Sequence, residues 1–428
     1  MGRRNTFIAI RLLPFIALLT SSSLFAQEYC FEERFRQPVF TSEEVELVED
    51  ISYGSAINWQ GDLKNLKLDI YQPIQSIDPL EKRPLLIFIH GGGYSGGNKQ
   101  TESIKFFGDT LSKYGYVFAS INYRLGWNNL TGCAGDTTDL ERARYRATQD
   151  SKAAIRYLIS VSEEFGIDTN MIILTGYSAG ATIAIYSALA EQSDFDDYLY
   201  NELGSIDSSG NTLYQHSADI KALITKSGGV KDFNIFLDKE IPMMMTHGTC
   251  DRVVPYYEGP VNSCYTPLRY PTYYGSRYIA DLLINSGTPF HMLTLEGGEH
   301  GDPDDSTFIH YVFNFLPDYL CDELVSTEFY NFGNGGCLIE SESELEVEIA
   351  PNPVKNELSI RIISALAGEY KFEIYNIQGQ LVHFSTAEFK PPVRDYTISS
   401  DRLNISRGIY FLQVSSEKYY GSYTFFKE

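Results

Sequence analysis

The chain has 428 residues, of which 43% are hydrophobic and 21% charged, and its formal net charge is −22. This length exceeds that of one typical domain, and the composition is ordinary for a folded protein. A surface this acidic repels nucleic acid and anionic lipid, so the charge argues against both as partners.

Residues 1–26 predict a cleaved signal peptide. They hold three arginines and no acid, an apolar run over residues 12–19, and the small residue Ala26 before the expected cleavage site. A membrane anchor is the alternative. The apolar run is shorter than the roughly 20 residues that a span needs, and Pro14 interrupts it. We therefore expect an exported protein without stable membrane insertion.

Six cysteines follow this segment. An even count in an exported chain predicts three disulfides, and many pairings are possible. The expected pairs are Cys250–Cys264 and Cys321–Cys337, which close short loops, and then Cys30–Cys133. No Cys-x-x-Cys motif is present, so the sequence predicts neither a metal site nor a cofactor.

The part of the chain over residues 27–337 alternates between strand-like and helix-like stretches. The run Leu85–Ile89 is apolar throughout, as in a strand buried on both faces. This alternation predicts an α/β fold with a doubly wound, mostly parallel sheet. Strands are expected at 66–71, 85–89, 116–123, 171–175, 218–224, 243–246 and 290–295, and helices at 148–161 and 179–189.

An acidic linker is predicted at 338–347, and the pattern changes after it. Short strands with alternating apolar residues follow one another without a helical stretch, which predicts a small all-β sandwich over 348–428. Its expected strands are 358–362, 370–375, 380–384, 409–414 and 419–426.

Residues 176–180, with the sequence GYSAG, match the pattern Gly-x-Ser-x-Gly between a predicted strand and a predicted helix. In this context the pattern indicates a nucleophile elbow, a tight turn that exposes the serine hydroxyl. The helix N-terminus behind the turn adds positive potential beside a developing oxyanion. We therefore predict that Ser178 is a catalytic nucleophile.

Residues 90–93, with the sequence HGGG, end the predicted strand 85–89. Glycines let backbone N–H groups approach a substrate oxygen, so an oxyanion hole is predicted from the N–H groups of Gly92, Gly93 and Ala179. A phosphate cradle is the alternative, but no Lys-Ser or Lys-Thr pair follows. Tyr94 and Tyr177, next to the two motifs, are predicted to contact the substrate.

The base and the acid follow from the order serine, acid, histidine along the chain. His300 lies in a Gly-rich loop just after a predicted strand, and Asp251 also follows a predicted strand end. Glu299 and Asp302 are rival acids, but they are too close in sequence to His300 to come from the preceding strand end. We expect His300 to be the base, Asp251 to orient it, and His247 to orient the loop of Asp251.

Residues 60–315 resemble the esterase/lipase branch of the α/β-hydrolases. The resemblance rests on the stretches LKLDIYQP, HGGGYSGGNK, INYRLG, FGIDTNMIILTGYSAGA, HGTCDRVVPY and GGEHG. It implies ester hydrolysis without a metal. One departure is Tyr177, because related enzymes often carry an acid at that position.

The last 80 or so residues resemble the C-terminal sorting domain of type IX secretion. The stretches APNPVKNELSI, YNIQGQLV and LNISRGIYFLQV carry the likeness. It implies export by the type IX secretion machinery, through the periplasm of an outer-membraned bacterium, to the cell surface or the medium. A carbohydrate-binding β module is the alternative, although no exposed tryptophan platform is evident.

The favoured function is a carboxylic ester hydrolase acting on short-acyl or aryl esters, such as acetyl or feruloyl groups of polysaccharides. The tyrosines of residues 256–274 either line a cleft for such esters or cover a sheet edge. A serine peptidase or polyester depolymerase on the same fold, and a non-catalytic carbohydrate-binding protein, are the alternatives.

Overall fold

The computed structural model describes most of the chain from Tyr29 to Glu428. The described ranges are 29–30, 34–127, 136–207, 210, 219–262, 270–332, 347–355, 357–362, 368–389, 395–399, 403, 405–416 and 420–428. The predicted signal peptide and nearly all of the predicted linker lie outside these residues. In the described part of the chain, no helix is both long and apolar enough to span a membrane.

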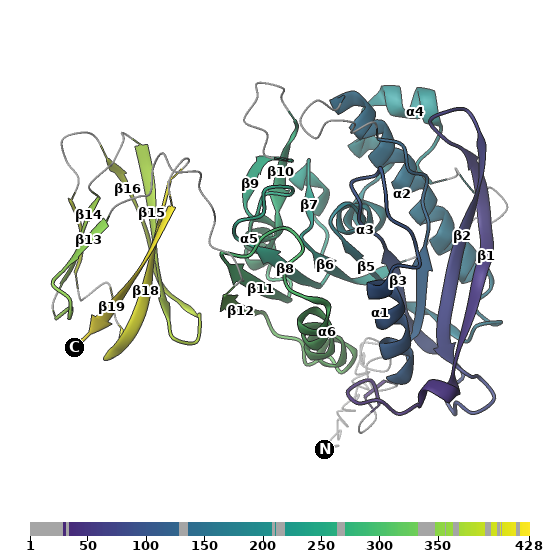
Figure 1. Cartoon of the computed structure of the whole chain (residues 1–428), viewed down its shortest axis with the longest axis horizontal. Helices are drawn as coiled ribbons and strands as arrows, with labels where there is room; N and C mark the ends of the chain where they lie inside the picture. Colours follow the sequence, from purple (N-terminus) through teal and green to yellow (C-terminus); the bar gives the residue numbers. More distant parts are fainter. Residues whose placement is uncertain are drawn as a thin grey trace, which may run out of the picture.

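A nine-stranded sheet forms the centre of the larger domain (Figure 1). The pairs β1–β2 and β2–β4 are antiparallel, and all other neighbours are parallel. The predicted doubly wound, mostly parallel sheet is therefore confirmed. In spatial order the strands are β1 (Val45–Ile57), β2 (Leu63–Pro73), β4 (Val117–Ile121), β3 (Arg83–Ile89), β5 (Ile167–Tyr177), β6 (Ile220–Lys226), β8 (Met243–Gly248), β11 (Phe290–Glu296) and β12 (Thr327–Phe332).

Helices cover both faces of this sheet, and each face has its own apolar core. One core includes side chains of α2 (Thr137–Ser160), α3 (Ala179–Leu189) and α5 (Ser276–Ser286). The other includes side chains of α1 (Glu102–Lys113) and α6 (Asp305–Leu320). Since the central strands are buried on both faces, they carry continuous apolar runs, as β3 does after Arg83.

Shorter elements complete the domain. A three-stranded antiparallel sheet has the order β7 (Gly229–Val230), β10 (Thr272–Gly275) and β9 (Glu258–Pro260). The short helices are α4 (Asp197–Leu203) and the 3₁₀ turns η2 (Ser42–Glu44), η3 (Gln192–Asp194) and η4 (Phe233–Phe236).

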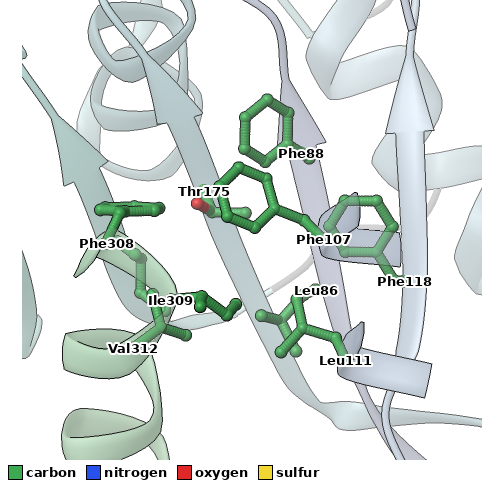
Figure 2. A pocket seen from close by; sticks show the side chains of 10 residues that line it. Leu86, Phe88, Phe107, Leu111, Phe118, Thr175, Phe308, Ile309 and Val312 are labelled. Atoms are coloured by element: carbon green, nitrogen blue, oxygen red, sulfur yellow. The ribbon is translucent and has the colours of Figure 1, made fainter. Parts of the chain in front are cut away.

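A small void lies between the sheet and the helices α1 and α6. Phe107 and Leu111 of α1 face Phe308 and Val312 of α6 across it (Figure 2). Its volume is about 10 Å³, which leaves at most the space of one water molecule, and its lining is almost entirely apolar. This void is a packing gap of the core and has no room for a substrate.

The C-terminal residues form a second, all-β unit, as predicted. Its three-stranded sheet has the order β13 (Val347–Ala350), β14 (Glu357–Ile362) and β17 (Asp395–Ser399). Its four-stranded sheet has the order β16 (Leu381–Phe389), β15 (Gly368–Asn376), β18 (Gly408–Ser415) and β19 (Tyr420–Lys427). Neighbouring strands are antiparallel, and side chains of both sheets share one core.

The predicted disulfides need correction. Cys30 is bonded to Cys321, with Cα atoms 5.1 Å apart, so the expected pairs Cys321–Cys337 and Cys30–Cys133 are wrong. The N-terminal segment packs beside the end of α6, where Arg36 pairs with Asp318 at 3.4 Å. Cys250 is also disulfide-bonded, but its partner lies outside the described residues, as do Cys133, Cys264 and Cys337.

Candidate active site

Ser178 lies on a sharp turn between β5 and α3. Its φ of 55° and ψ of −121° are unusual for a residue with a side chain, and its N–H donates to the Lys226 carbonyl at 2.9 Å. The flanking glycines are required by space. A Cβ on Gly176 would lie 2.5 Å from the Gly180 carbonyl, and one on Gly180 would lie 2.0 Å from the Ile89 carbonyl.

Three predicted side chains meet in one hydrogen-bonded chain. Ser178 Oγ lies 2.8 Å from His300 Nε2, and His300 Nδ1 lies 2.7 Å from Asp251 Oδ2. The residues are far apart in sequence, and they meet because β5, β8 and β11 run parallel with their carboxyl ends at one edge of the sheet. A serine, a histidine and a carboxylate in this order can activate a hydroxyl for attack on a carbonyl carbon.

Asp251 is held from several directions. Its Oδ1 accepts the N–H groups of Val253 at 2.8 Å and Val254 at 2.9 Å, and its Oδ2 also lies 3.1 Å from His247 Nε2. Burial raises the pKa of the Asp251 carboxyl, but the hydrogen bonds from His247 and His300 outweigh burial and hold that pKa well below its usual value. Asp251 is therefore a carboxylate at neutral pH.

The glycine-rich loop lies next to the serine. Gly92 and Gly93 have φ of 104° and 57°, and a Cβ on Gly92 would lie 2.3 Å from the Gly96 carbonyl oxygen. Gly93 and Ala179 line the same cavity as Ser178, whereas Gly92 does not border it. The loop is thus placed where backbone N–H groups can approach an oxygen bound at the serine.

His90 begins this loop and is buried. Its Nδ1 donates to the Gly91 carbonyl at 2.7 Å, and its ring stacks on Tyr123 with centroids 4.3 Å apart. Burial lowers the pKa of His90 to about 4, only partly offset by the bond to Gly91, so the imidazole is neutral at neutral pH. His90 therefore shapes the loop without adding charge to it.

The two tyrosines predicted to contact substrate lie in different places. Tyr94 lines the cavity beside Ser178. Tyr177 instead stacks on His300, with ring centroids 5.4 Å apart, and its other neighbour is Lys226, whose Nζ lies 5.3 Å from the ring centroid. Tyr177 therefore contacts the candidate base and does not border the cavity.

The rival acids are placed away from this chain of hydrogen bonds. Asp302 Oδ2 accepts the N–H of Glu299 at 2.8 Å, within the loop of His300 itself.

In the described residues, no group of three or more His, Cys, Asp or Glu side chains is arranged to hold a metal ion.

The tyrosines of residues 256–274 divide between the two predicted roles. Tyr273 lines the cavity, and Tyr256 is bonded to Thr294 at 2.8 Å. Tyr257 and Tyr274 both contact Tyr278 in an outer aromatic cluster. Tyr265 lies outside the described residues.

Sequence reasoning missed some of the side chains that border the cavity. Trp127 precedes α2 and Leu140 lies within it, and both face the cavity beside Ser178. No motif marks either residue. Their only signal is hydrophobicity, in a stretch where buried charged residues interrupt the helical pattern. The same interruption explains why the predicted helix starts at residue 148, whereas α2 begins at Thr137.

Comparison with known proteins agrees with this fold. Residues 68–241 match the protein family described as BD-FAE, whose members share the α/β-hydrolase fold seen here. These residues belong to the larger domain, which has the α/β-hydrolase fold. Residues 348–426 match the family described as a secretion system C-terminal sorting domain.

Among curated relatives, gut esterase 1 of Caenorhabditis elegans is 35% identical over 116 residues, which are 27% of this chain and 19% of the relative. Kynurenine formamidase avaC of Aspergillus versicolor is 32% identical over 133 residues, 29% of this chain and 43% of that protein. The chain thus spans about a fifth of the length of gut esterase 1. Among solved structures, Thermogutta terrifontis esterase 2 is 18% identical with a TM-score of 0.42, covering 67% of this chain and 98% of the other.

Proposed function

We propose that this α/β-hydrolase is a serine carboxylic ester hydrolase, with Ser178 as nucleophile, His300 as general base and Asp251 as the acid that orients the base. The continuous chain of hydrogen bonds from Ser178 Oγ through both nitrogens of His300 to Asp251 Oδ2, at 2.8 and 2.7 Å, carries the proposal. The names of similar proteins, such as gut esterase 1, point to the same activity.

In the first half-reaction, His300 Nε2 takes the Ser178 proton while Oγ forms a bond to the ester carbonyl carbon, and the carbonyl oxygen becomes an oxyanion. Asp251 stabilises the protonated imidazole and keeps its Nδ1–H directed at the carboxylate. The tetrahedral intermediate then collapses, the bond to the alcohol oxygen breaks, and the alcohol leaves with the proton from Nε2. Water repeats the sequence on the acyl-enzyme and releases the acid.

The oxyanion is assigned to the N–H groups of Gly92, Gly93 and Ala179. Gly93 and Ala179 border the cavity at Ser178, and Ala179 begins α3, whose N-terminus adds positive potential. Each donor in such a hole contributes roughly 100- to 1000-fold in rate. Tyr94, in the same wall, is assigned to substrate contact, and Tyr177 to the support of His300.

The substrates are assigned to short-acyl or aryl esters, such as acetyl or feruloyl groups on polysaccharides. The C-terminal sorting domain supports export by a secretion system to the cell surface or the medium, where such polymers are met. The type IX machinery of an outer-membraned bacterium is the expected partner in that export.

Hydrolysis of p-nitrophenyl acetate and butyrate by the purified chain tests the activity. Ser178→Ala is expected to lower kcat by about 10⁶-fold, because the nucleophile is lost. Ser187→Ala is the matched control. Ser187 is buried like Ser178, but it lies within α3 and outside the site. We expect the control to keep the wild-type rate.

Equal rates for wild type and Ser178→Ala would overturn the proposal. Cleavage of an acyl p-nitroanilide at rates above those for the matching ester would favour amide or peptide hydrolysis on the same triad. Saturable carbohydrate binding without ester cleavage would favour a binding protein.

A further inference from the structure

The cavity beside Ser178 is small, partly open to solvent and mostly apolar. Its volume is about 50 Å³. The reacting end is formed by Ser178, Ala179 and Gly93, and the remaining wall includes Trp127, Leu140 and Val261. An apolar cavity beside the nucleophile discriminates between substrates by the size of the ester group that binds in it.

The group that enters is assigned to the acyl half of the substrate. During the proposed reaction the acyl carbon stays bonded to Ser178 Oγ until water arrives, whereas the alcohol must depart before water can attack. A cavity that encloses part of one half of the ester therefore suits the half that remains. The alcohol half, including any polymer chain, is left on the open side.

The size of the cavity discriminates between short aliphatic acyl groups, such as acetyl, and aromatic acyl groups, such as feruloyl. An apolar cavity of about 150 Å³ in another protein holds one benzene molecule. The cavity here has about a third of that volume, so it could enclose a whole aromatic ring only if the walls moved apart. A short alkyl group fits without such movement.

The inner wall is held in place. Tyr94 and Tyr273 are buried, and behind them lies the buried Arg144, which is ion-paired with Glu141 and has its guanidinium 4.3 Å from the Tyr186 ring centroid. Burial raises the pKa of both tyrosines, and the nearby positive charge of Arg144 offsets part of that rise. Moving either tyrosine would disturb the packing beside this buried charge, which is unfavourable.

A second part of the cavity wall is anchored too. Leu140 projects from α2 and is buried, and the Trp127 indole donates to the Asp136 carbonyl at 3.3 Å, at the residue that caps α2. Trp127 also meets Tyr270 edge to face, with ring centroids 6.1 Å apart. Both parts of the wall are therefore held by packing, and the part around Trp127 also by a hydrogen bond.

Resting on the proposed function, we propose that the site accepts straight aliphatic acyl groups of about two to four carbons and excludes hydroxycinnamoyl groups, with Leu140 and Val261 setting the limit of length. This choice leaves acetyl-type esters and removes feruloyl-type esters from the substrate range. In a hydrophobic pocket one methylene changes the rate by about 10- to 200-fold, so the limit should be sharp.

The test compares kcat/KM for p-nitrophenyl acetate, butyrate, octanoate and ferulate, which share one leaving group. We expect acetate and butyrate to exceed octanoate and ferulate by at least about 10-fold. Leu140→Ala, which enlarges the cavity, should raise the octanoate-to-acetate ratio by about 10-fold or more. Val261→Leu, which fills the cavity, should lower the butyrate-to-acetate ratio.

Leu158→Ala is the matched control, because Leu158 is a buried leucine of α2 that does not border the cavity. It should destabilise the fold and leave the ratios unchanged. Octanoate or ferulate cleaved as fast as acetate by the wild type would overturn the acyl limit while the esterase proposal stands. Failure to cleave any of the four esters would instead overturn the esterase proposal, on which the limit rests.

Discussion

Two segments of the molecule each bring a histidine to the same carboxylate oxygen. His300, in the loop after β11, and His247, within β8, lie 2.7 and 3.1 Å from Asp251 Oδ2. The His300 side chain is 18% exposed, and its second nitrogen faces Ser178. The His247 side chain is 0% exposed, and its second nitrogen lies 2.9 Å from Ser276 Oγ.

The second partner decides what each ring can do. His247 Nε2 faces two acceptors, Asp251 Oδ2 and the Val254 carbonyl, so we assign the proton to Nε2 and let Nδ1 accept from the Ser276 hydroxyl. Both nitrogens of His247 are thus committed inside the protein. His300 has one nitrogen at the hydroxyl of the proposed nucleophile, so only His300 can exchange a proton with substrate. We therefore propose that His247 is a positioning residue that acts through Asp251.

Asp251→Asn would remove the carboxylate that both histidines contact. An asparagine in this place favours the wrong tautomer of His300, so we expect kcat to fall by about 10⁴-fold for p-nitrophenyl acetate. Asp168→Asn is the control, because Asp168 is a buried aspartate that accepts from the Tyr29 hydroxyl, in contact with the N-terminal segment. A rate for Asp251→Asn within tenfold of the wild type would exclude Asp251 as the orienting acid.

A third histidine sharpens the comparison, because His90 is buried like His247 but donates from Nδ1 to a neutral carbonyl, that of Gly91. Burial lowers its folded pKa to about 4 from the ordinary 6.5. Between these pH values the unfolded chain binds a proton that the folded chain does not. Stability from this group is therefore complete above pH 6.5 and is lost as pH falls toward 4, by about 3 kcal/mol in all.

Urea unfolding of wild type and His90→Asn between pH 7.5 and 4.5 measures this loss. The variant should show the shallower fall in the free energy of unfolding as pH decreases. His291, whose pKa burial also lowers, contributes a loss of the same sign to both proteins, so the difference between them isolates His90. Identical slopes would contradict the assignment of a depressed pKa to His90.

The sequence predicted that Ser178, His300 and Asp251 lie together because each follows a strand of a parallel sheet, and strand ends of such a sheet meet at one edge. The contact between His247 and Asp251 depends on how the chain turns after β8, where the N–H groups of Val253 and Val254 bend it back onto the carboxylate. No periodicity encodes that turn. The sequence therefore suggested only a supporting role for His247.

The start of α2 and the Cys30–Cys321 disulfide could not be predicted from the sequence for a different reason. Glu141, Arg144 and Arg146 are buried charged residues within α2, and they break the apolar pattern that would mark a helix and the cavity wall beside it. The Cys30–Cys321 bond joins residues 291 apart in sequence, whereas loop length along the chain favoured nearer partners. Both depend on tertiary packing, which local pattern does not report.

His247→Leu and His247→Gln test the buried side of the comparison alone. Leucine removes the donor to Asp251, and a hydrogen bond to a charged group is worth about 1.5–3 kcal/mol, so kcat should fall by about 10- to 100-fold. Glutamine still has an N–H to donate and should retain most of the rate. KM should change little in either variant, because His247 does not border the cavity.

A purely structural role for His247 would show itself differently. It would lower the free energy of unfolding and the amount of active enzyme, and would leave kcat per active site unchanged. Titrating active sites with an organophosphate that labels Ser178 separates the two, since the labelling rate follows nucleophile activation and the amplitude follows the folded fraction. We expect the labelling rate to fall in His247→Leu and to recover in His247→Gln, which stability alone would not produce. An unchanged rate with reduced amplitude would leave His300 as the only histidine that acts on Asp251.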